Sequence, residues 1–586
     1  MVKDAFSWVL ASIFVVALAV LATRLKEVQI DDAADYNYAK SRQSVRRVQL
    51  GGIRGRILDR NGEVLADNRR SVSIVCAAEH FQKRTWTETI AAIDGEIAKV
   101  AKVIGRPSPL SERAIKLHVN QSLAMPLVVW RDVGDVVLAR FCEHESEFKG
   151  FSVMESTERV YPQGAMASHL LGYVGRERGE VEAGDEKFNF CLPEMRGRSG
   201  LEIYYDSFLR GVSGEKKLLV DARGFAISEW VVAAPRRGPD LNISLDVNIQ
   251  RLVERELAGE KGACVVIDPV DGDVLAFASQ PGYDPNSFVP SLNRELYHRY
   301  STDASKPLLN RASGGAYAPG STFKPITALA GLAAGFSEHQ TYDCNGVFVL
   351  GSMRLRCASR WGHGPLDMRE ALCESCNPYF CHLATTVGTN HIIRAARSFA
   401  LGEKTGIDLG VDIAGVVPDA EWKMSVYSER WYPGDLPQMA IGQGMLLVSP
   451  LQMARVAGAI ATGHLVRPRI NLEVPVSRKR LPFSESHLKV VREGMRRVVD
   501  GGTGKKGGSD LAVEVCGKTG TAEIGRGETK RKNTWFIAYA PRVSPRVALA
   551  ILVEDGKSGG STAAPKARNI LAGIFGEKSS AGEVAR

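Results

Sequence analysis

The sequence predicts an α+β fold built on an antiparallel sheet, carried behind one amino-terminal transmembrane helix. The uncharged run Ala5 to Thr23 has the length of a membrane span. Strand-like segments stand in pairs at both ends of residues 240–576, and the sequence between them is rich in helical patterns. Hydrophobic residues make up 44% and charged residues 24% of the 586 residues, which excludes a wholly disordered or many-pass membrane protein.

The amino-terminal run is interpreted as an uncleaved anchor within residues 1–24. A helix of this length spans about 28 Å, and the run exceeds the ~7–15 residue core of a signal peptide. A cleaved signal peptide is the alternative, because small residues near the end of the run resemble a cleavage site. Arg24 and Lys26 outnumber Lys3, and this bias alone would place the body in the cytoplasm.

Turn residues divide the body into two domains. Residues 25–235 form a mixed pedestal, the linker 235–239 contains two prolines and a glycine, and residues 240–576 form the second domain. The tail 577–586 is expected to be disordered. Asn-Gly and Asp-Gly turns predict hairpins. The expected pairs are Arg54 to Ala66, Ala263 to Ile267 with Val274 to Ser279, and Thr534 to Tyr539 with Val547 to Val553, followed by a helix from Pro565 to Phe575.

The overall charge and the cysteine content narrow the possible partners. A formal charge of +9 is mild for this length and fits an anionic substrate or a membrane surface, so nucleic acid is not expected as a partner. Ten cysteines are too few for a disulfide scaffold in so long a chain.

The first chemical motif is Pro319-Gly320-Ser321-Thr322-Phe323-Lys324. Pro-Gly breaks the chain, and the apolar run that follows predicts a helix opened by Ser321. Ser321 and Lys324 share one face of its first turn, which suits a serine nucleophile whose proton passes to a neighbouring amine. Two other Ser-x-x-Lys segments, at Ser213 and Ser486, stand at no such break and are interpreted as chance spacing.

The second motif is Ser375-Cys376-Asn377. Pro378 prevents a preceding helix from simply continuing, so the triplet is expected in a loop between helices. A hydroxyl and an amide in such a loop can relay a proton and hold a peptide carbonyl.

The third motif is Lys518-Thr519-Gly520-Thr521. A strand is expected just before it, at Val513 to Cys516. Gly520 leaves room for another chain against the strand edge, and the lysine and threonine side chains can bind a carboxylate.

The three motifs in this order are the signature of β-lactamases and penicillin-binding proteins. The chain resembles a class B penicillin-binding protein, most closely the elongation type called penicillin-binding protein 2. The resemblance covers nearly the whole length. Segments that carry the subtype are Tyr317, Trp361-Gly362-His363-Gly364 and Trp431-Tyr432-Pro433-Gly434-Asp435. It implies a transpeptidase domain with a helix-flanked antiparallel sheet and an all-helical subdomain, on an elongated pedestal.

The resemblance implies a peptidoglycan D,D-transpeptidase that works without a catalytic cofactor. Ser321 would form an acyl-enzyme with a stem peptide, with Lys324, Ser375, Asn377 and Lys518 as further catalytic residues. The substrate-binding residues would be Thr519, Gly520 and Thr521, and the backbone N–H groups of Ser321 and Thr521 would stabilise the oxyanion. β-Lactams would acylate the same serine.

The same resemblance implies where the protein works and with what. Cell-wall stems lie outside the cytoplasmic membrane, so we expect an extracytoplasmic (periplasmic) catalytic domain, against the flanking-charge argument. Because no glycosyltransferase domain is evident, the implied partners are a membrane-embedded SEDS-type glycosyltransferase and elongation-complex proteins.

A second cluster of residues surrounds the second motif: Cys344, Cys357, His363 and Cys376. Three thiolates and one imidazole form a good tetrahedral zinc set. Some elongation-type relatives bind zinc near this position, so a structural zinc is a hypothesis here. The alternatives are a Cys344–Cys357 disulfide with Cys376 as a buried filler, or free thiols. Cys373 is a possible substitute ligand.

Basic residues at Arg526 and 530–532 follow the third motif. They are expected on a hairpin loop near the cleft, as a solvated turn or as an attraction for acidic stem peptides or lipid head groups.

Three other functions share the motifs. A β-lactamase would need a deacylating water and base, which the sequence does not reveal. A noncatalytic β-lactam sensor or scaffold would be expected to have several membrane passes, an output domain, or a lost motif lysine. The division-type (septal) homologue differs only in subtype motifs.

Overall fold

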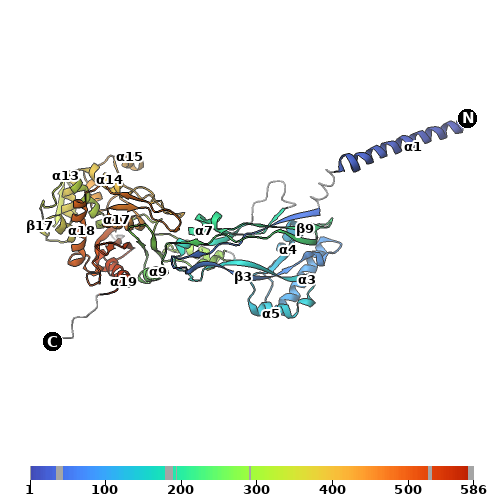
Figure 1. Cartoon of the computed structure of the whole chain (residues 1–586), viewed down its shortest axis with the longest axis horizontal. Coiled ribbons are helices and arrows are strands. Elements are labelled where there is room, and N and C mark those ends of the chain that lie inside the picture. Colours follow the sequence, from blue (N-terminus) through green and yellow to red (C-terminus); the bar gives the residue numbers. More distant parts are fainter. Residues whose placement is uncertain are drawn as a thin grey trace.

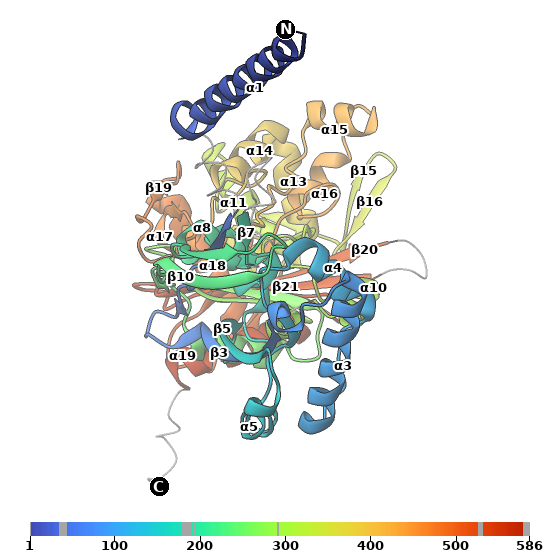
Figure 2. The same cartoon turned by 90° about the vertical axis from the view of Figure 1, so that its right-hand side faces the viewer.

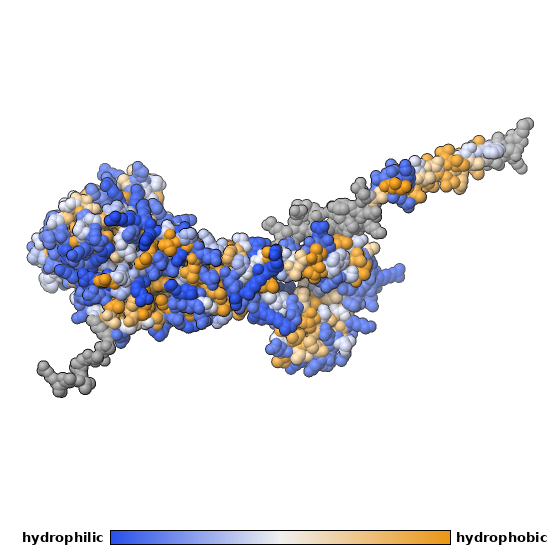
Figure 3. Space-filling view, in the orientation of Figure 1, coloured by the Kyte–Doolittle hydropathy of each residue, from blue (hydrophilic) through white to orange (hydrophobic). Residues whose placement is uncertain are grey.

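The chain forms an elongated body of two lobes, with one apolar helix standing apart from it (Figure 1). The computed structural model describes residues 2–33, 44–177, 189–192, 194–289, 292–525 and 531–577. Helix α1 (Val2–Lys26) is the predicted amino-terminal helix. The segment Trp8–Asp31 has a mean hydropathy of 2.2 and is long and apolar enough to cross a membrane, and Figure 3 shows its hydrophobic surface. Most of the tail expected to be disordered, residues 578–586, lies outside the described residues.

The carboxyl-terminal lobe is built on one five-stranded antiparallel sheet. Its strand order is β13 (Val274–Gln280), β12 (Gly262–Ile267), β22 (Val547–Val553), β21 (Arg531–Ala540) and β20 (Cys516–Ile524). Both predicted strand pairs of this lobe are confirmed, and β12 joins them by pairing with β22. Strand β20 lies at the edge of the sheet.

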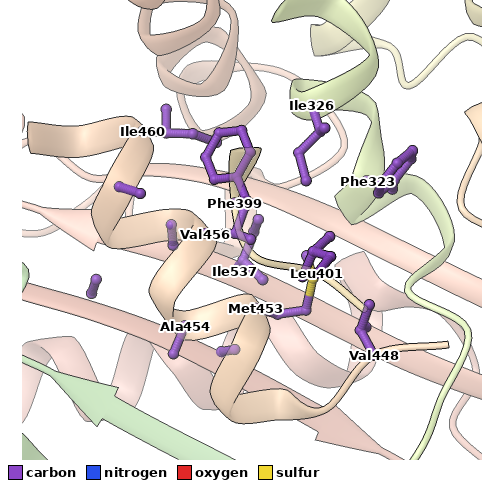
Figure 4. Packing of buried hydrophobic residues seen from close by; sticks show 14 of the residues in the cluster. Phe323, Ile326, Phe399, Leu401, Val448, Met453, Ala454, Val456, Ile460 and Ile537 are labelled. Carbon is purple, nitrogen blue, oxygen red and sulfur yellow. The ribbon is translucent and has the colours of Figure 1, made fainter. Parts of the chain in front are cut away.

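Helices cover both faces of this sheet because its strands are apolar on both sides. Phe536 and Ala538 of β21 pack with α9 (Val247–Leu257) and α19 (Ala564–Phe575) on one face. Ile537 points to the other face, where α17 (Pro450–Thr462) and α11 (Lys324–Ala333) complete the main core (Figure 4).

A helical subdomain stands beside the edge of the sheet that carries β20. Its α12 (Met368–Cys373) begins with the reciprocal Asp367–Glu370 capping bonds, and α13 (Asn377–Val387) has Pro378 in its first turn. Ser375 and Cys376 therefore form the predicted loop between helices, and Asn377 is the first residue of α13. The other helices here include α14 (Thr389–Ser398), α16 (Asp435–Ala440) and α18 (Glu485–Asp500).

The amino-terminal lobe is a mixed pedestal with two larger sheets and a two-stranded one of β6 (Val174–Glu177) and β8 (Glu194–Gly197). The predicted hairpin around Asn61-Gly62 is confirmed as β2 (Ile57–Leu58) and β3 (Val64–Cys76). Strand β3 continues between β4 (Leu127–Trp130) and β5 (Phe151–Val160). The second sheet has the order β10 (Ala226–Ala233), β9 (Gly214–Val220), β1 (Val45–Leu50) and β7 (Asn189–Cys191).

Near the junction of the lobes, charged side chains are buried together. Glu202 is fully buried, and its carboxylate accepts hydrogen bonds of 2.6 Å from Arg54 and 2.7 Å from Arg159. Although burial opposes it, the two guanidinium groups hold the pKa of Glu202 below its usual value. Strand β11 (Leu241–Asn242) returns the chain to β2 just before the second lobe begins. The domain limits given above, 25–235 and 240–576, stay a prediction.

One strand was predicted in the wrong place. The sequence favoured Val513 to Cys516, but β20 begins at Cys516 and contains the whole third motif up to Ile524. Polar residues such as Lys518 and Thr519 are unusual in a buried strand, so the sequence pattern favoured the apolar residues before them. Both side chains are nevertheless buried, because other polar groups lie against this strand edge and can form hydrogen bonds with them.

Candidate active site

Lys324 lies at the centre of the predicted site. It is fully buried at the start of α11, and its Nζ donates hydrogen bonds to the backbone oxygen of Ser375 at 2.6 Å and to Asn377 Oδ1 at 2.7 Å. The Nζ atom also lies 3.3 Å from Ser375 Oγ and 5.6 Å from the centre of the Phe380 ring. The first and second motifs, which are distant in sequence, therefore meet through one ammonium group.

Lys518 reaches the same hydroxyl from the sheet. Its side chain is fully buried, and its Nζ donates to Ser375 Oγ at 2.8 Å and to the backbone oxygen of Thr519 at 3.1 Å. Ser375 has a φ of +55°, a conformation that non-glycine residues adopt rarely and that recurs at functional sites. The loop thus holds one hydroxyl between two lysines.

Burial and proximity change the acid–base properties of both lysines. Burial lowers the pKa of Lys324 to about 8. Burial, together with the nearby charge of Lys324, holds the pKa of Lys518 well below its usual value. A neutral amine is therefore accessible near pH 7, and a neutral amine is the form that accepts a proton.

Ser321 sits in the turn Gly320–Phe323 that precedes α11, and its side chain is half-buried. Within the described parts of the chain, its hydroxyl makes no hydrogen bond, so it is available to a ligand. Gly320 fixes the turn against the sheet: a Cβ there would lie 2.9 Å from the backbone oxygen of Thr521. This close approach brings the backbone of Ser321 next to that of Thr521, the two residues expected to supply the oxyanion N–H groups.

Gly442 explains one family-like segment, Ile441 to Gly444. Its φ is +73°, and a Cβ on it would lie 2.0 Å from the backbone oxygen of Gly320. Its own carbonyl accepts a 2.7 Å hydrogen bond from Gly320 N–H. Only glycine fits this position, and the contact supports the serine turn from behind.

The third motif is held by contacts that the sequence did not reveal. Thr519 Oγ1 is 2.8 Å from Thr503 Oγ1, and Thr521 Oγ1 accepts a 3.1 Å hydrogen bond from Gly559 N–H. The space left by Gly520 is taken by the serine turn, because a Cβ there would lie 2.8 Å from the Pro319 oxygen. The glycine was expected to admit another chain, and it admits the chain's own nucleophile segment.

The cysteine and histidine cluster assembles directly behind the second motif. The ligand atoms of Cys344, Cys357, His363 and Cys376 all lie within 4.8 Å of one another. Cys357 Sγ is 3.5 Å from His363 Nδ1 and 4.0 Å from Cys376 Sγ. Cys344 and Cys357 are free thiols in the structure, so the disulfide alternative is not formed there. Cys373 lies apart from the cluster, with its Sγ 3.4 Å from the Arg497 oxygen.

Electrostatics within the cluster favour a bound thiolate. The hydrogen bond between the thiols lowers the pKa of Cys357 and raises that of Cys376. His363 Nε2 lies 3.9 Å from a carboxylate oxygen of Glu374, on the side away from Cys357. A carboxylate in this position commonly orients a metal-bound imidazole.

Comparison with known proteins identifies the family. Residues 262–572 match the penicillin-binding protein transpeptidase domain, and residues 50–243 match the penicillin-binding protein dimerisation domain. The chain belongs to the penicillin-binding protein transpeptidase family. The family predicted from the three motifs is therefore confirmed.

Similar proteins within this family are also named as transpeptidases. "Peptidoglycan D,D-transpeptidase MrdA" of Acinetobacter baumannii is 31% identical over 583 residues, covering 94% of this chain and 84% of the relative. A solved complex between penicillin-binding protein 2 and MreC from Helicobacter pylori has a TM-score of 0.75 at 27% identity, covering 90% of this chain and 99% of the neighbour. A peptidoglycan synthase complex has a TM-score of 0.72 at 28% identity, with 98% of each chain covered.

Several supporting residues of this penicillin-binding protein were missed from the sequence. They are Thr503, Phe380 and the backbone oxygen of Arg356, which accepts a 2.9 Å hydrogen bond from Asn377 Nδ2. The glycine-rich segment 501–504 was a usable signal for Thr503, because glycines permit the close approach of other backbones. The other two carried no signal. A sequence does not distinguish this phenylalanine from any other, and every residue has a backbone carbonyl group.

Proposed function

We propose that this chain is a peptidoglycan D,D-transpeptidase that cross-links stem peptides during cell elongation, through an acyl-enzyme on Ser321. The observation that carries the proposal is the meeting of Lys324 and Lys518 at the Ser375 hydroxyl, beside the serine turn. The confirmed family and the relatives named D,D-transpeptidase MrdA support the reaction.

In the first half-reaction, Ser321 Oγ attacks the carbonyl carbon of the penultimate D-Ala, and neutral Lys324 accepts its proton. The oxyanion forms next to the backbone N–H groups of Ser321 and Thr521; losing one such donor typically slows a reaction by about 10²–10³. As the C–N bond breaks, the terminal D-Ala amine takes a proton relayed through the Ser375 hydroxyl and leaves.

In the second half-reaction, an amine of a neighbouring stem attacks the ester carbonyl. That amine loses a proton to the same lysine–serine relay, the C–O bond breaks, and Ser321 recovers its hydroxyl proton. Asn377 keeps Lys324 in place, while the third motif faces the terminal carboxylate of the donor. β-Lactams would acylate Ser321 in the same way and release slowly.

The anchor and the partners follow from this function. Helix α1 would hold the protein in the cytoplasmic membrane as a single span, with the catalytic lobe outside, where stem peptides are found. The neighbours solved with MreC and in a peptidoglycan synthase complex support assembly with elongation proteins. A SEDS-type glycosyltransferase would be the polymerising partner in this proposal.

A structural zinc belongs to the same proposal. The four donors beside the catalytic loop match the tetrahedral sulfur and nitrogen ligation that zinc prefers, and their separations fit one ion. Cys344, Cys357, His363 and Cys376 would hold it. A bound zinc supplies four fixed bonds, and it takes no part in acyl transfer. Because Cys376 lies between Ser375 and Asn377, these bonds would brace the loop that orients Lys324.

The test is reaction of the purified full-length protein with a fluorescent penicillin, followed by mass mapping of the labelled peptide. We expect stoichiometric label on Ser321 that persists for many minutes, and no label in the S321A variant. The matched control is S486A, which alters the exposed serine of a chance Ser-x-x-Lys segment. Label on another residue would defeat the site assignment, and turnover within seconds would indicate a β-lactamase.

A further inference from the structure

The hairpin of β15 (Val347–Leu350) and β16 (Met353–Arg356) has two chemically different faces. Alternation along the strands places Phe348, Leu350, Met353 and Leu355 toward the main core. The other face carries Val349, which is 50% exposed, and the exposed side chains of Arg354 and Arg356. The inner face therefore holds the hairpin in place and leaves two arginines on its outer face.

This hairpin is attached directly to the catalytic groups. The backbone oxygen of Arg356 accepts a 2.9 Å hydrogen bond from Asn377 Nδ2, and the same amide accepts from Lys324 through Oδ1. Cys357, the next residue, belongs to the metal-ligand cluster. Strand β16 is thus the edge of the hairpin nearest the active site. In Figure 2, β15, β16 and the end of β20 project on the same side of the catalytic lobe.

The arginines of this hairpin and of the loop after it pair with no carboxylate among the described residues. They are Arg354, Arg356 and the exposed Arg360. Arg360 instead lies 5.6 Å from the ring centre of Trp361, which is 87% exposed. Arg531 and Lys532, also exposed, stand at the start of β21, in the hairpin that carries the third motif. Unpaired guanidinium groups on a fixed hairpin are well suited to carboxylates, which they can bind in a bidentate fashion.

We infer that the outer face of the β15–β16 hairpin, through Arg354 and Arg356, binds the carboxylates of an acidic peptide that enters the active site. The inference rests on the proposed transpeptidase function and adds a substrate subsite to it. The arginines touch no reacting atom; they select and orient a peptide whose acyl group lies at Ser321. A small β-lactam does not extend to this hairpin and gains little from it.

The experiment measures how well a synthetic stem peptide ending in D-Ala-D-Ala slows fluorescent-penicillin acylation of the full-length protein. One peptide keeps its side-chain carboxylates free, and a second has them amidated. For wild type, we expect the acidic peptide to inhibit more strongly. The R354Q/R356Q double variant should raise the inhibition constant of the acidic peptide by about five- to tenfold, the size expected for two exposed ion pairs. The constant for the amidated peptide should stay within about twofold.

Matched controls separate this effect from general loss of charge. The variant R478Q/R480Q removes two exposed arginines from β19 (Arg478–Arg480), with the same spacing as Arg354 and Arg356. Figure 2 shows β19 on the side of the lobe opposite to the β15–β16 hairpin. This variant should leave both inhibition constants unchanged. The preference for the acidic peptide should also shrink in 0.5 M salt, because exposed charges are screened. Thermal unfolding shows whether each variant is folded.

The outcomes distinguish this inference from the proposed function. If wild type is not labelled at Ser321, the function fails. If labelling occurs but the R354Q/R356Q variant keeps the wild-type preference for the acidic peptide, or if both inhibition constants rise to the same extent, the subsite is wrong. Loss of binding to phosphatidylglycerol vesicles, with peptide inhibition unchanged, would assign the arginines to lipid and would also overturn the inference.

Discussion

Lys324 and Lys518 approach the same oxygen atom, Ser375 Oγ, at 3.3 and 2.8 Å. Both ammonium groups are buried, and two positive charges this close oppose each other's protonation. The arrangement therefore favours a state in which one amine is neutral and the other is charged. The neutral lysine can act as a base, while the charged lysine holds the Ser375 hydroxyl between the two amines.

The rate of acylation should depend on pH through Lys324. Its pKa is lowered to about 8, so the amine is mostly protonated at pH 6 and mostly neutral at pH 9. The second-order rate constant for penicillin should rise about tenfold per pH unit below this value and level off above it. Stopped-flow measurements from pH 6 to 9.5 check this, and a rate that is flat or falls with rising pH would contradict a lysine base.

Replacing Asn377 with Asp should shift that profile. The new carboxylate would lie near Lys324 Nζ, where the amide oxygen is now 2.7 Å away, and would favour the protonated amine. We expect N377D to raise the pKa of the profile by about one unit and to slow acylation at pH 7.5 about tenfold. The control N390D places the same charge on an exposed residue of α14 and should have no effect. An unshifted pH profile in N377D would show that Asn377 does not influence protonation of the catalytic base.

Removal of the proposed zinc should loosen the catalytic loop. The variant C357S should bind less than one zinc per chain by elemental analysis and should unfold at least about 5 °C below wild type. The exposed Cys142 supplies the control, because C142S removes a thiol far from the cluster. Wild-type protein without stoichiometric zinc, or a C357S variant with an unchanged Tm, argues against the metal.

The buried cluster around Glu202 should dominate the stability of the amino-terminal lobe. E202Q leaves the guanidinium groups of Arg54 and Arg159 buried without their shared carboxylate, and we expect a loss of about 3–5 kcal/mol in the free energy of unfolding. Glu155, which pairs with Arg70 on the surface, provides the comparison. E155Q should change stability by less than about 0.5 kcal/mol in the same urea titration. Equal effects of the two variants would refute this assignment.

Local signals accounted for much of the fold. Turn residues such as Asp271-Gly272 predicted the hairpins, since few residues accept their backbone angles, and apolar runs predicted the helices of the main core. The pairing of β12 with β22 was expected only as a sheet assembled from distant sequence, because register depends on contacts between segments far apart in the chain.

The motif residues of the site could be predicted from the sequence, but the contacts that depend on tertiary structure could not. Ser321, Lys324, Ser375 and Lys518 belong to recurring motifs, and the structure brings the side chains of the last three together. The location of β20 was wrong because burial of Lys518 comes from the tertiary structure and leaves no trace in local hydrophobicity. Contacts such as Thr503 with Thr519 join separate elements, so sequence patterns alone could not specify them.

The order of strands in the catalytic sheet also constrains biosynthesis. Strand β12 is made well before its neighbour β22, which comes from the last part of the chain, and both β22 and β21 lie between β12 and the strand that bears the third motif. A nascent chain therefore cannot complete the catalytic sheet until β22, near its carboxyl end, has been made. A premature stop codon just before Val547 should therefore leave a product that carries all three motifs but lacks the strand that joins β12 to β21.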